Sequence, residues 1–149
     1  MIMTEFRKIS IIGLGLIASS ICLTIRKKDL GIQIVGYDKD KEVRNRAKKI
    51  GLCEIESNIK NAASDSELII LCVPVGQMQA VIQKLKKFIR PGTIITDVGS
   101  VKLSVIDELE FTIEEAKGNF VPSHPIAGLS LIHISEPTRR YAISYAVFC

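Results

Sequence analysis

Two side chains of this 149-residue sequence, His124 and Ser100, have the chemistry of an acid–base site. A neutral imidazole accepts a proton near physiological pH, so a histidine held beside a bound cofactor is a candidate general base. His124 lies between Pro122 and Pro125. A lone histidine is more often structural, and Ser100 could instead cap a helix that begins at the next residue. We predict both as catalytic residues, provided that the fold brings them to one edge beside a cofactor.

A glycine-rich turn near the N-terminus is suited to hold such a cofactor. Residues 13–18 read Gly-Leu-Gly-Leu-Ile-Ala and follow an apolar run at 8–12. In the pattern G-x-G-x-x-[GA], the first glycine makes a tight turn and the second lets a diphosphate approach the backbone. The third small residue lets the next helix pack on the strand. Glycines also occur in ordinary strand-to-helix turns, so the motif alone is a weak prediction of dinucleotide binding.

Asp38 strengthens the prediction, because it stands twenty residues beyond Ala18 at the end of the apolar run 32–37. A carboxylate there accepts hydrogen bonds from both hydroxyls of the adenine ribose. It also repels a 2′-phosphate, so the sequence predicts NAD rather than NADP as the cofactor. Lys39 and Lys41 leave use of both cofactors open, since a nearby cation accommodates that phosphate. Asp38 could alternatively be the N-cap of the helix expected from Lys39.

A third segment, residues 73–76, follows the most apolar run of the chain at 68–73. It is either a simple strand-ending turn or a surface that packs against the cofactor ribose, since ligands bind at the carboxyl ends of strands in this kind of sheet. The full set of predicted cofactor-binding residues is Gly13, Gly15, Leu16, Ile17, Ala18, Asp38, Val73, Pro74, Val75 and Ser100.

Apolar runs alternate with helical patterns along the chain. Strands are expected at 8–12, 32–37, 53–55, 68–73, 93–96 and 119–121. The first helix is expected to carry Leu14, Ile17, Ile21 and Ile25, and the second to span about 39–50 with Val43, Ala47 and Ile50 buried. A single helical turn is expected over 59–63. A fourth helix should run from Met78 through Phe88 and Ile89 and end at Pro91-Gly92, and a fifth should cover 101–110. This alternation predicts an α/β fold with a doubly wound, mainly parallel Rossmann-type sheet.

The bulk composition is typical of a globular, cytoplasmic protein. The chain is 47% hydrophobic and 24% charged, which allows one domain with a sizeable core. No apolar segment suits a membrane span, and no signal peptide is recognisable. The four cysteines lack paired spacing and are predicted to be reduced, without a metal site. The charge of +4 comes partly from cations at expected helix ends, and only 5% of residues are aromatic, which argues against a nucleic-acid partner.

The last 21 residues, 129–149, do not continue the strand–helix alternation. Residues 129–139 match a translated transposase-type sequencing adapter over eleven codons, residues 140–142 stand where a sample index would be, and 143–149 match the outer end of that adapter. The alternative is an ordinary terminal hairpin, since residues 143–148 are apolar enough for a strand. We expect an NAD-binding domain over 1–128 and a non-native tail over 129–149.

Taken together, these motifs resemble the prephenate dehydrogenase family, which includes arogenate and cyclohexadienyl dehydrogenases of tyrosine biosynthesis. The resemblance rests on the glycine turn at 13–18, Asp38, residues 71–75, and the segments Asp97-Val98-Gly99-Ser100-Val101-Lys102 and His124-Pro125-Ile126-Ala127-Gly128. It implies the oxidative decarboxylation of prephenate or arogenate, with NAD as hydride acceptor. It also implies that His124 draws the proton from the substrate hydroxyl and that Ser100 helps to position the histidine and the nicotinamide.

Members of that family continue past the histidine motif with a helical domain that mediates dimerisation and supplies cations for the substrate carboxylates. The adapter-like residues 129–149 occupy that position here. The resemblance therefore implies a homodimeric whole protein, and a chain that lacks the C-terminal helical domain and a complete substrate site. Two alternatives stay open: another NAD-dependent dehydrogenase or reductase with a helical second domain, and a non-catalytic, redox-sensing dinucleotide-binding module.

Overall fold

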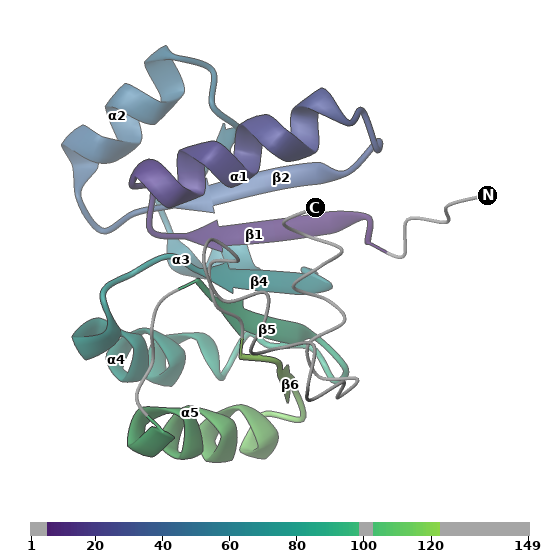
Figure 1. Ribbon diagram of the computed structural model, residues 1–149, viewed down its shortest axis with the longest axis vertical. Helices are drawn as coiled ribbons and strands as arrows, with labels where there is room; N and C mark the ends of the chain where they lie inside the picture. The colour runs from purple at the N-terminus through teal and green to yellow at the C-terminus, as the bar shows by residue number, and fades with distance from the viewer. Residues whose placement is uncertain (1–5, 99–102, 123–149) are drawn as a thin grey trace, which may run out of the picture.

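Six parallel strands form one sheet within residues 6–98 and 103–122, which are the part of the chain that the computed structural model describes. In chain order the strands are β1 (Lys8–Ile12), β2 (Gln33–Tyr37), β3 (Glu54–Ile55), β4 (Leu68–Leu71), β5 (Ile94–Asp97) and β6 (Asn119–Phe120). Their order in the sheet is β3-β2-β1-β4-β5-β6 (Figure 1). The chain moves outward from β1 to β3, then crosses to β4 and moves outward the other way. This arrangement confirms the predicted doubly wound parallel sheet.

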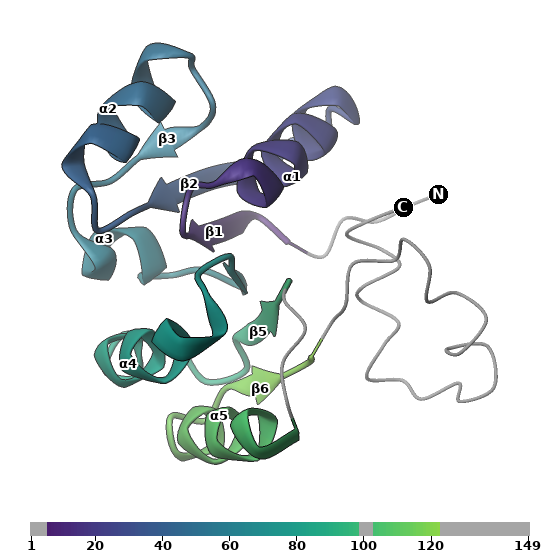
Figure 2. The ribbon, with the colours of Figure 1, turned by 60° about the vertical axis from the view of Figure 1, so that its left-hand side comes forward.

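Helices cover both faces of the sheet (Figures 1 and 2). Their bounds are α1 (Leu16–Lys27), α2 (Lys41–Lys49), α3 (Ile59–Ala63), α4 (Val75–Leu85) and α5 (Leu103–Glu115). One hydrophobic cluster joins α1 and Ala47 of α2 to one face, and a second joins α3, α4 and α5 to the other face. None of the helices in these ranges is long and apolar enough to cross a membrane.

The strands are apolar on both sides because both of their faces are covered. Successive residues of a strand point to opposite faces. Accordingly, Ile9 and Ile11 of β1 belong to the cluster under α1, whereas Ile12 belongs to the cluster under α4. All four residues of β4 are fully buried, with no exposed surface. Each such aliphatic side chain contributes about 1.5–3 kcal/mol through burial.

The first helix begins later than its apolar spacing predicts. Leu14 lies in the turn before α1 and is only 6% exposed, whereas Ile17 lies in the first turn of α1 and is 48% exposed. The inward-facing stripe of α1 is Ala18, Ile21, Cys22 and Ile25, at positions i, i+3, i+4 and i+7. The expectation that the first helix carries Leu14 is therefore wrong, because the glycine turn delays the start of the helix, whereas Ile17 lies in α1 as expected.

The expectation that Ile50 is buried is also wrong, since this side chain is 70% exposed. Gly51 adopts φ +64°, which only glycine adopts readily. The Leu52 amide then donates to the Ala47 carbonyl at 3.0 Å and the Gly51 amide donates to the Lys48 carbonyl at 3.1 Å. This helix-ending turn directs Leu52, 3% exposed, into the core in place of Ile50.

Helix α4 ends at Leu85, before the end at Pro91-Gly92 that the spacing predicts. The Phe88 amide donates to the Leu85 carbonyl at 2.7 Å in a tight turn that follows the helix. Ile89 still reaches the core at 8% exposure, so the apolar spacing marks burial correctly and the helix end incorrectly. The other element bounds agree with expectation to within two or three residues, apart from α5, which extends five residues past the expected 110.

Candidate functional site

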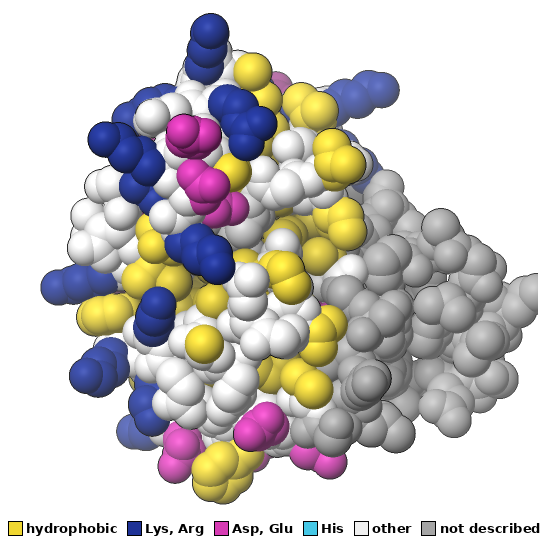
Figure 3. Space-filling model, turned by 90° about the vertical axis from the view of Figure 1, so that its left-hand side faces the viewer, with side chains coloured by type: hydrophobic (Ala, Val, Ile, Leu, Met, Phe, Trp, Pro, Cys, Tyr) yellow, Lys and Arg dark blue, Asp and Glu magenta, His cyan; other side chains and the backbone are white. Residues whose placement is uncertain are grey.

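The carboxyl ends of the parallel strands meet at one edge of the sheet, toward which the arrows of Figure 1 point. The chain leaves β1 there at Gly13, β2 at Asp38, β4 at Cys72 and β5 at Val98. Figure 3 looks onto this edge and shows hydrophobic side chains between groups of Lys and Arg. Because β1 pairs with both β2 and β4, the point where the direction of winding reverses lies beside Gly13. Ligands bind at such points in open α/β sheets.

Gly13 makes a turn that another residue could not make without strain. Its φ is +96°, and a Cβ there would lie 2.7 Å from the Cys72 carbonyl oxygen and 3.0 Å from Cγ1 of Val73. The Gly13 amide donates to the Tyr37 carbonyl at 2.8 Å. The turn is therefore pressed between the ends of β2 and β4, and its first glycine is required by the fold itself.

The fold itself does not require glycine at position 15, because a Cβ there would meet no atom within 4 Å and the space above it is open. Gly15 is the N-cap of α1 and provides no side-chain cap, and the first turn of this described helix holds no acidic residue. The first amides of a helix have no partner within the helix, and they attract anions. The open space over Gly15 and the uncapped amides of α1 fit a diphosphate group.

The carboxylate of Asp38 is held beside this turn by two backbone amides. Its Oδ2 accepts a hydrogen bond from the Leu14 amide at 3.0 Å, and its Oδ1 accepts one from the Asp40 amide at 2.9 Å. Asp40, not Asp38, caps α2, with its side chain accepting from the Glu42 amide at 2.8 Å. The alternative that Asp38 is the helix N-cap is wrong. Each oxygen of Asp38 keeps a lone pair with which to accept a further bond.

Leu14 fixes the glycine turn over β2 by packing against Gly36. A Cβ at Gly36 would lie 2.8 Å from Cδ2 of Leu14 and 2.9 Å from Sγ of Cys53. The missing side chain of Gly36 therefore makes room for Leu14, whose amide holds Asp38. Sequence reasoning missed Gly36, although a glycine inside an apolar strand is a recognised sign of close approach by another segment.

A cavity of about 510 Å³ lies beside Asp38, between the start of α1 and helix α2. Gly15, Leu16, Val43 and Arg46 contribute to its lining. Leu16 is 91% exposed at the first turn of α1. This hollow and the open space over Gly15 adjoin each other, so a ligand seated over the turn has room to extend along Asp38.

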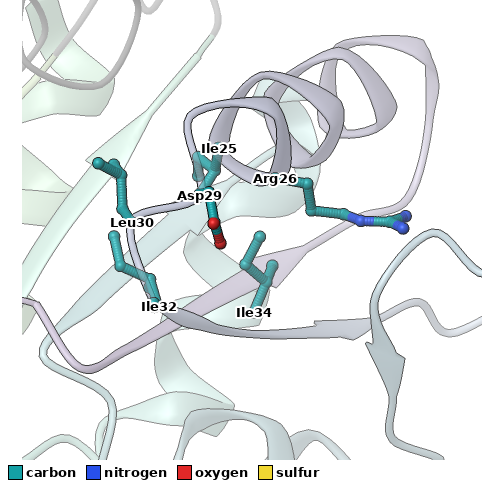
Figure 4. Close-up of a pocket in the computed structure, with 7 residues that line it drawn as sticks. Ile25, Arg26, Asp29, Leu30, Ile32 and Ile34 are labelled. Carbon is teal, nitrogen blue, oxygen red and sulfur yellow. The ribbon is translucent and has the colours of Figure 1, made fainter.

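A smaller cavity of about 240 Å³ lies at the other end of α1, near Asp29, Leu30 and Ile32 (Figure 4). The Arg26 side chain extends away from it, and its Nη1 donates to the Gly51 carbonyl at 2.6 Å. This cavity is at the opposite edge of the sheet from the glycine turn. It is therefore separate from the candidate site.

The segment after β4 abuts the glycine turn. Pro74 is the N-cap of α4, and Val75 is the first residue of that helix. Val73 and Val75 are partly buried against the core, so their predicted contact with a ribose involves only the surface that they leave exposed.

The two predicted catalytic residues, Ser100 and His124, lie outside the described residues. The strands before them are described: the Val98 amide donates to the Leu71 carbonyl at 3.2 Å, and the Val121 amide donates to the Ile95 carbonyl at 2.9 Å. The chain therefore leaves β5 and β6 at the edge that carries Gly13 and Asp38.

The family comparison adds to this geometry. The model of a family described as "Prephenate dehydrogenase, nucleotide-binding domain" matches residues 21–136, which is well over half of the 149-residue chain. The chain belongs to the prephenate dehydrogenase family. The match starts beyond the glycine turn, so the assignment of residues 13–18 rests on their geometry. It ends within the segment 129–149.

Individual relatives agree with the family assignment. The chain is 39% identical over 127 residues to a cyclohexadienyl dehydrogenase of Zymomonas mobilis, covering 85% of this chain and 43% of the relative. It is 36% identical over 123 residues to a prephenate dehydrogenase of Lactococcus lactis, covering 82% of this chain and 34% of that one. A crystal structure of prephenate dehydrogenase from A. aeolicus in complex with hydroxyphenyl propionate and NAD+ superposes with a TM-score of 0.74 at 26% identity, over 84% of this chain and 43% of that one. The chain thus spans less than half the length of these relatives.

Cys72 borders the glycine turn of this family member, and its side chain packs against the core. Burial raises the pKa of the Cys72 thiol to about 12, and Cys22 and the nearby Asp97 carboxylate add to the rise. The thiol therefore stays protonated at neutral pH. Since the thiolate is the nucleophilic form, Cys72 is unsuited to covalent chemistry at this edge.

We expect iodoacetamide at pH 8 to alkylate Cys72 at least about a hundredfold more slowly in the folded chain than in the chain unfolded by denaturant, because the raised pKa leaves the folded thiol almost wholly protonated. Mass spectrometry of the peptide that contains Cys72, sampled over time, measures both rates. Equal rates in the two states would contradict the raised pKa of the Cys72 thiol in the folded chain.

Proposed function

We propose that the carboxyl edge of this sheet binds NAD, with the diphosphate over Gly15 and the amides of α1, and with the adenine ribose on Asp38. The observation that carries the proposal is the Asp38 carboxylate, which two amides hold beside an open glycine turn. The shared family and the crystal structure of the A. aeolicus enzyme in complex with NAD+ support the same assignment. The aspartate disfavours a 2′-phosphate, which is why we propose NAD rather than NADP.

We further propose that the whole protein catalyses the oxidative decarboxylation of prephenate or arogenate in tyrosine biosynthesis, acting as a homodimer. When bound, NAD supplies a hydride acceptor for this reaction. His124 takes the proton of the substrate hydroxyl, and Ser100 positions His124 and the nicotinamide. Loss of carbon dioxide makes the ring aromatic, so the main task of the protein is to align donor and acceptor.

The activity is tested with the protein encoded by the uninterrupted gene. Absorbance at 340 nm is followed with NAD and with either prephenate or arogenate as substrate. We expect reduction of NAD with at least one of the two substrates. If neither reduces NAD, the proposed reaction is wrong, and a redox-sensing or other dinucleotide-binding role replaces it.

For the tail, we propose that residues 129–149 are non-native. The support is the match of residues 129–139 to an adapter over eleven codons, whereas the family match, which extends through residue 136, weighs against it. The nucleotide sequence across codons 125–145 separates the two interpretations. Adapter codons there support the proposal, and codons that differ from those of the adapter would overturn it.

The cofactor assignment predicts that two neighbouring carboxylates, Asp38 and Asp40, contribute very differently to the affinity for NADH. We expect Asp38→Asn to weaken NADH binding by about 10- to 100-fold, because hydrogen bonds from the ribose to a charged carboxylate are lost. Asp40→Asn removes the same charge, but asparagine still caps α2, so NADH binding stays within about twofold. Fluorescence titration of both variants measures the effect. Equal NADH affinity of the two variants would show that Asp38 does not bind the ribose.

A further inference from the structure

The turn between β2 and α2 is closed by one arginine that no sequence motif identifies. Arg44 lies in the second turn of α2, and its side chain folds back toward the start of the helix. Its Nη1 donates to the Asp38 carbonyl at 2.6 Å and to the Lys39 carbonyl at 3.1 Å. Its guanidinium carbon lies 5.9 Å from the centroid of the Tyr37 ring. One guanidinium therefore contacts three successive residues, 37–39.

These contacts bear on the orientation of the Asp38 carboxylate. Oδ1 of Asp38 accepts its hydrogen bond from the Asp40 amide, which belongs to the peptide that joins residues 39 and 40. The carbonyl of that same peptide is the Lys39 carbonyl, an acceptor of Arg44. Because a peptide group is planar, fixing its carbonyl also fixes the direction of its amide. Arg44 thus holds the amide that orients Asp38.

The position of Arg44 also bears on the choice between cofactors. An arginine near this aspartate is expected to receive a 2′-phosphate in proteins that use NADP. Here the guanidinium is half-buried against Tyr37 and bonds to two carbonyls, whereas Lys41 and Lys48 on the same helix are exposed. Nη1 of Arg44 is engaged with both carbonyls, so the guanidinium is held against the turn that carries Asp38.

We propose that Arg44 is a positioning residue for cofactor recognition, which fixes the turn at residues 38–40 so that the Asp38 carboxylate is set for the ribose before the cofactor arrives. This inference rests on the proposed binding of NAD. It predicts that Arg44 acts through Asp38 and not through direct contact with the cofactor. A charge-assisted bond to a carbonyl is stronger than a neutral one, so glutamine cannot replace arginine here, whereas lysine replaces it in part.

The test is a set of NADH and NADPH titrations on the 149-residue chain, with thermal unfolding measured for each variant. We expect Arg44→Gln to raise the Kd for NADH about 5- to 10-fold, and Arg44→Lys to raise it less. Lys48→Gln removes the same charge from an exposed site on α2 and should leave the Kd within twofold. The double variant Asp38→Asn/Arg44→Gln should bind NADH no more than twofold more weakly than Asp38→Asn alone, because Arg44 acts through Asp38.

The outcomes separate the inference from the function on which it rests. If the unaltered chain does not bind NADH, the proposed function fails and the inference fails with it. If the unaltered chain binds NADH but Arg44→Gln binds it equally well, only the inference is overturned. The same holds if the losses of NADH affinity caused by Asp38→Asn and Arg44→Gln add up in the double variant. A loss confined to NADPH would show instead that Arg44 receives the 2′-phosphate. If Arg44→Gln does not fold, the NADH affinity of Arg44→Lys and of its double variant with Asp38→Asn decides the question.

Discussion

Replacing His124 by asparagine in the whole protein is expected to lower kcat by about 10²- to 10⁴-fold, the range that a positioned general base contributes. Asparagine has a similar size and can form hydrogen bonds, but it cannot take up the proton of the substrate hydroxyl. The Kd for NADH should stay within about twofold, because our assignment places the binding of NADH on Gly15 and Asp38. Steady-state kinetics and NADH titration on the same preparation measure both quantities.

This result also separates an enzyme from a redox sensor. A sensor that reports bound NADH has no need of a general base, and it would keep its output in the His124→Asn variant. A variant that retains full turnover would remove His124 from the catalytic role, and a variant that loses NADH binding would indicate that His124 supports the fold or the cofactor instead.

Replacing Gly13 by alanine is expected to lower the free energy of unfolding by about 3–5 kcal/mol. One part of this loss is the strain of a non-glycine residue at φ +96°, which costs about 1–3 kcal/mol. Another part is the approach of the new Cβ to within 2.7 Å of the Cys72 carbonyl oxygen, a backbone atom that cannot move without disturbing β4. Urea denaturation measures the change.

Gly76→Ala is the matched control for Gly13→Ala. Gly76 lies in α4, has no positive φ, and a Cβ there would meet no atom within 4 Å. Alanine in a helix is favoured over glycine by about 0.5–1 kcal/mol, so this variant should be as stable as the unaltered chain or slightly more stable. Equal destabilisation by the two substitutions would contradict the described turn at Gly13.

The sequence predicts the sheet well because the pattern that marks each strand is local in the sequence. Each main strand is a short apolar run covered on both faces, and glycine or proline marks most of its boundaries. The sequence predicts the start of α1 and the burial of Ile50 wrongly, because both depend on how the turns at Gly13 and Gly51 redirect the chain. Apolar spacing alone does not contain that information.

The residues of the candidate site also fall into two groups, those recognisable from local sequence and those that depend on contacts across the fold. The glycine pair and Asp38 follow a spacing that can be recognised in the sequence, and the structure brings them together through the Leu14 amide. Gly36 and Arg44 were missed, because their importance comes from contacts across the fold, with Leu14 in one case and with the carbonyls of residues 38 and 39 in the other. An arginine in the second turn of a helix is otherwise a common surface residue.

Binding of NADH and NADPH to the 149-residue chain, followed by the fluorescence of the reduced nicotinamide, is the most direct test of the NAD site at Asp38. The amides over the glycine turn and the Asp38 carboxylate predict that NADH binds and that its Kd is at least about tenfold lower than that of NADPH. Failure to bind NADH, or tighter binding of NADPH, would contradict the assignment of this edge as an NAD site.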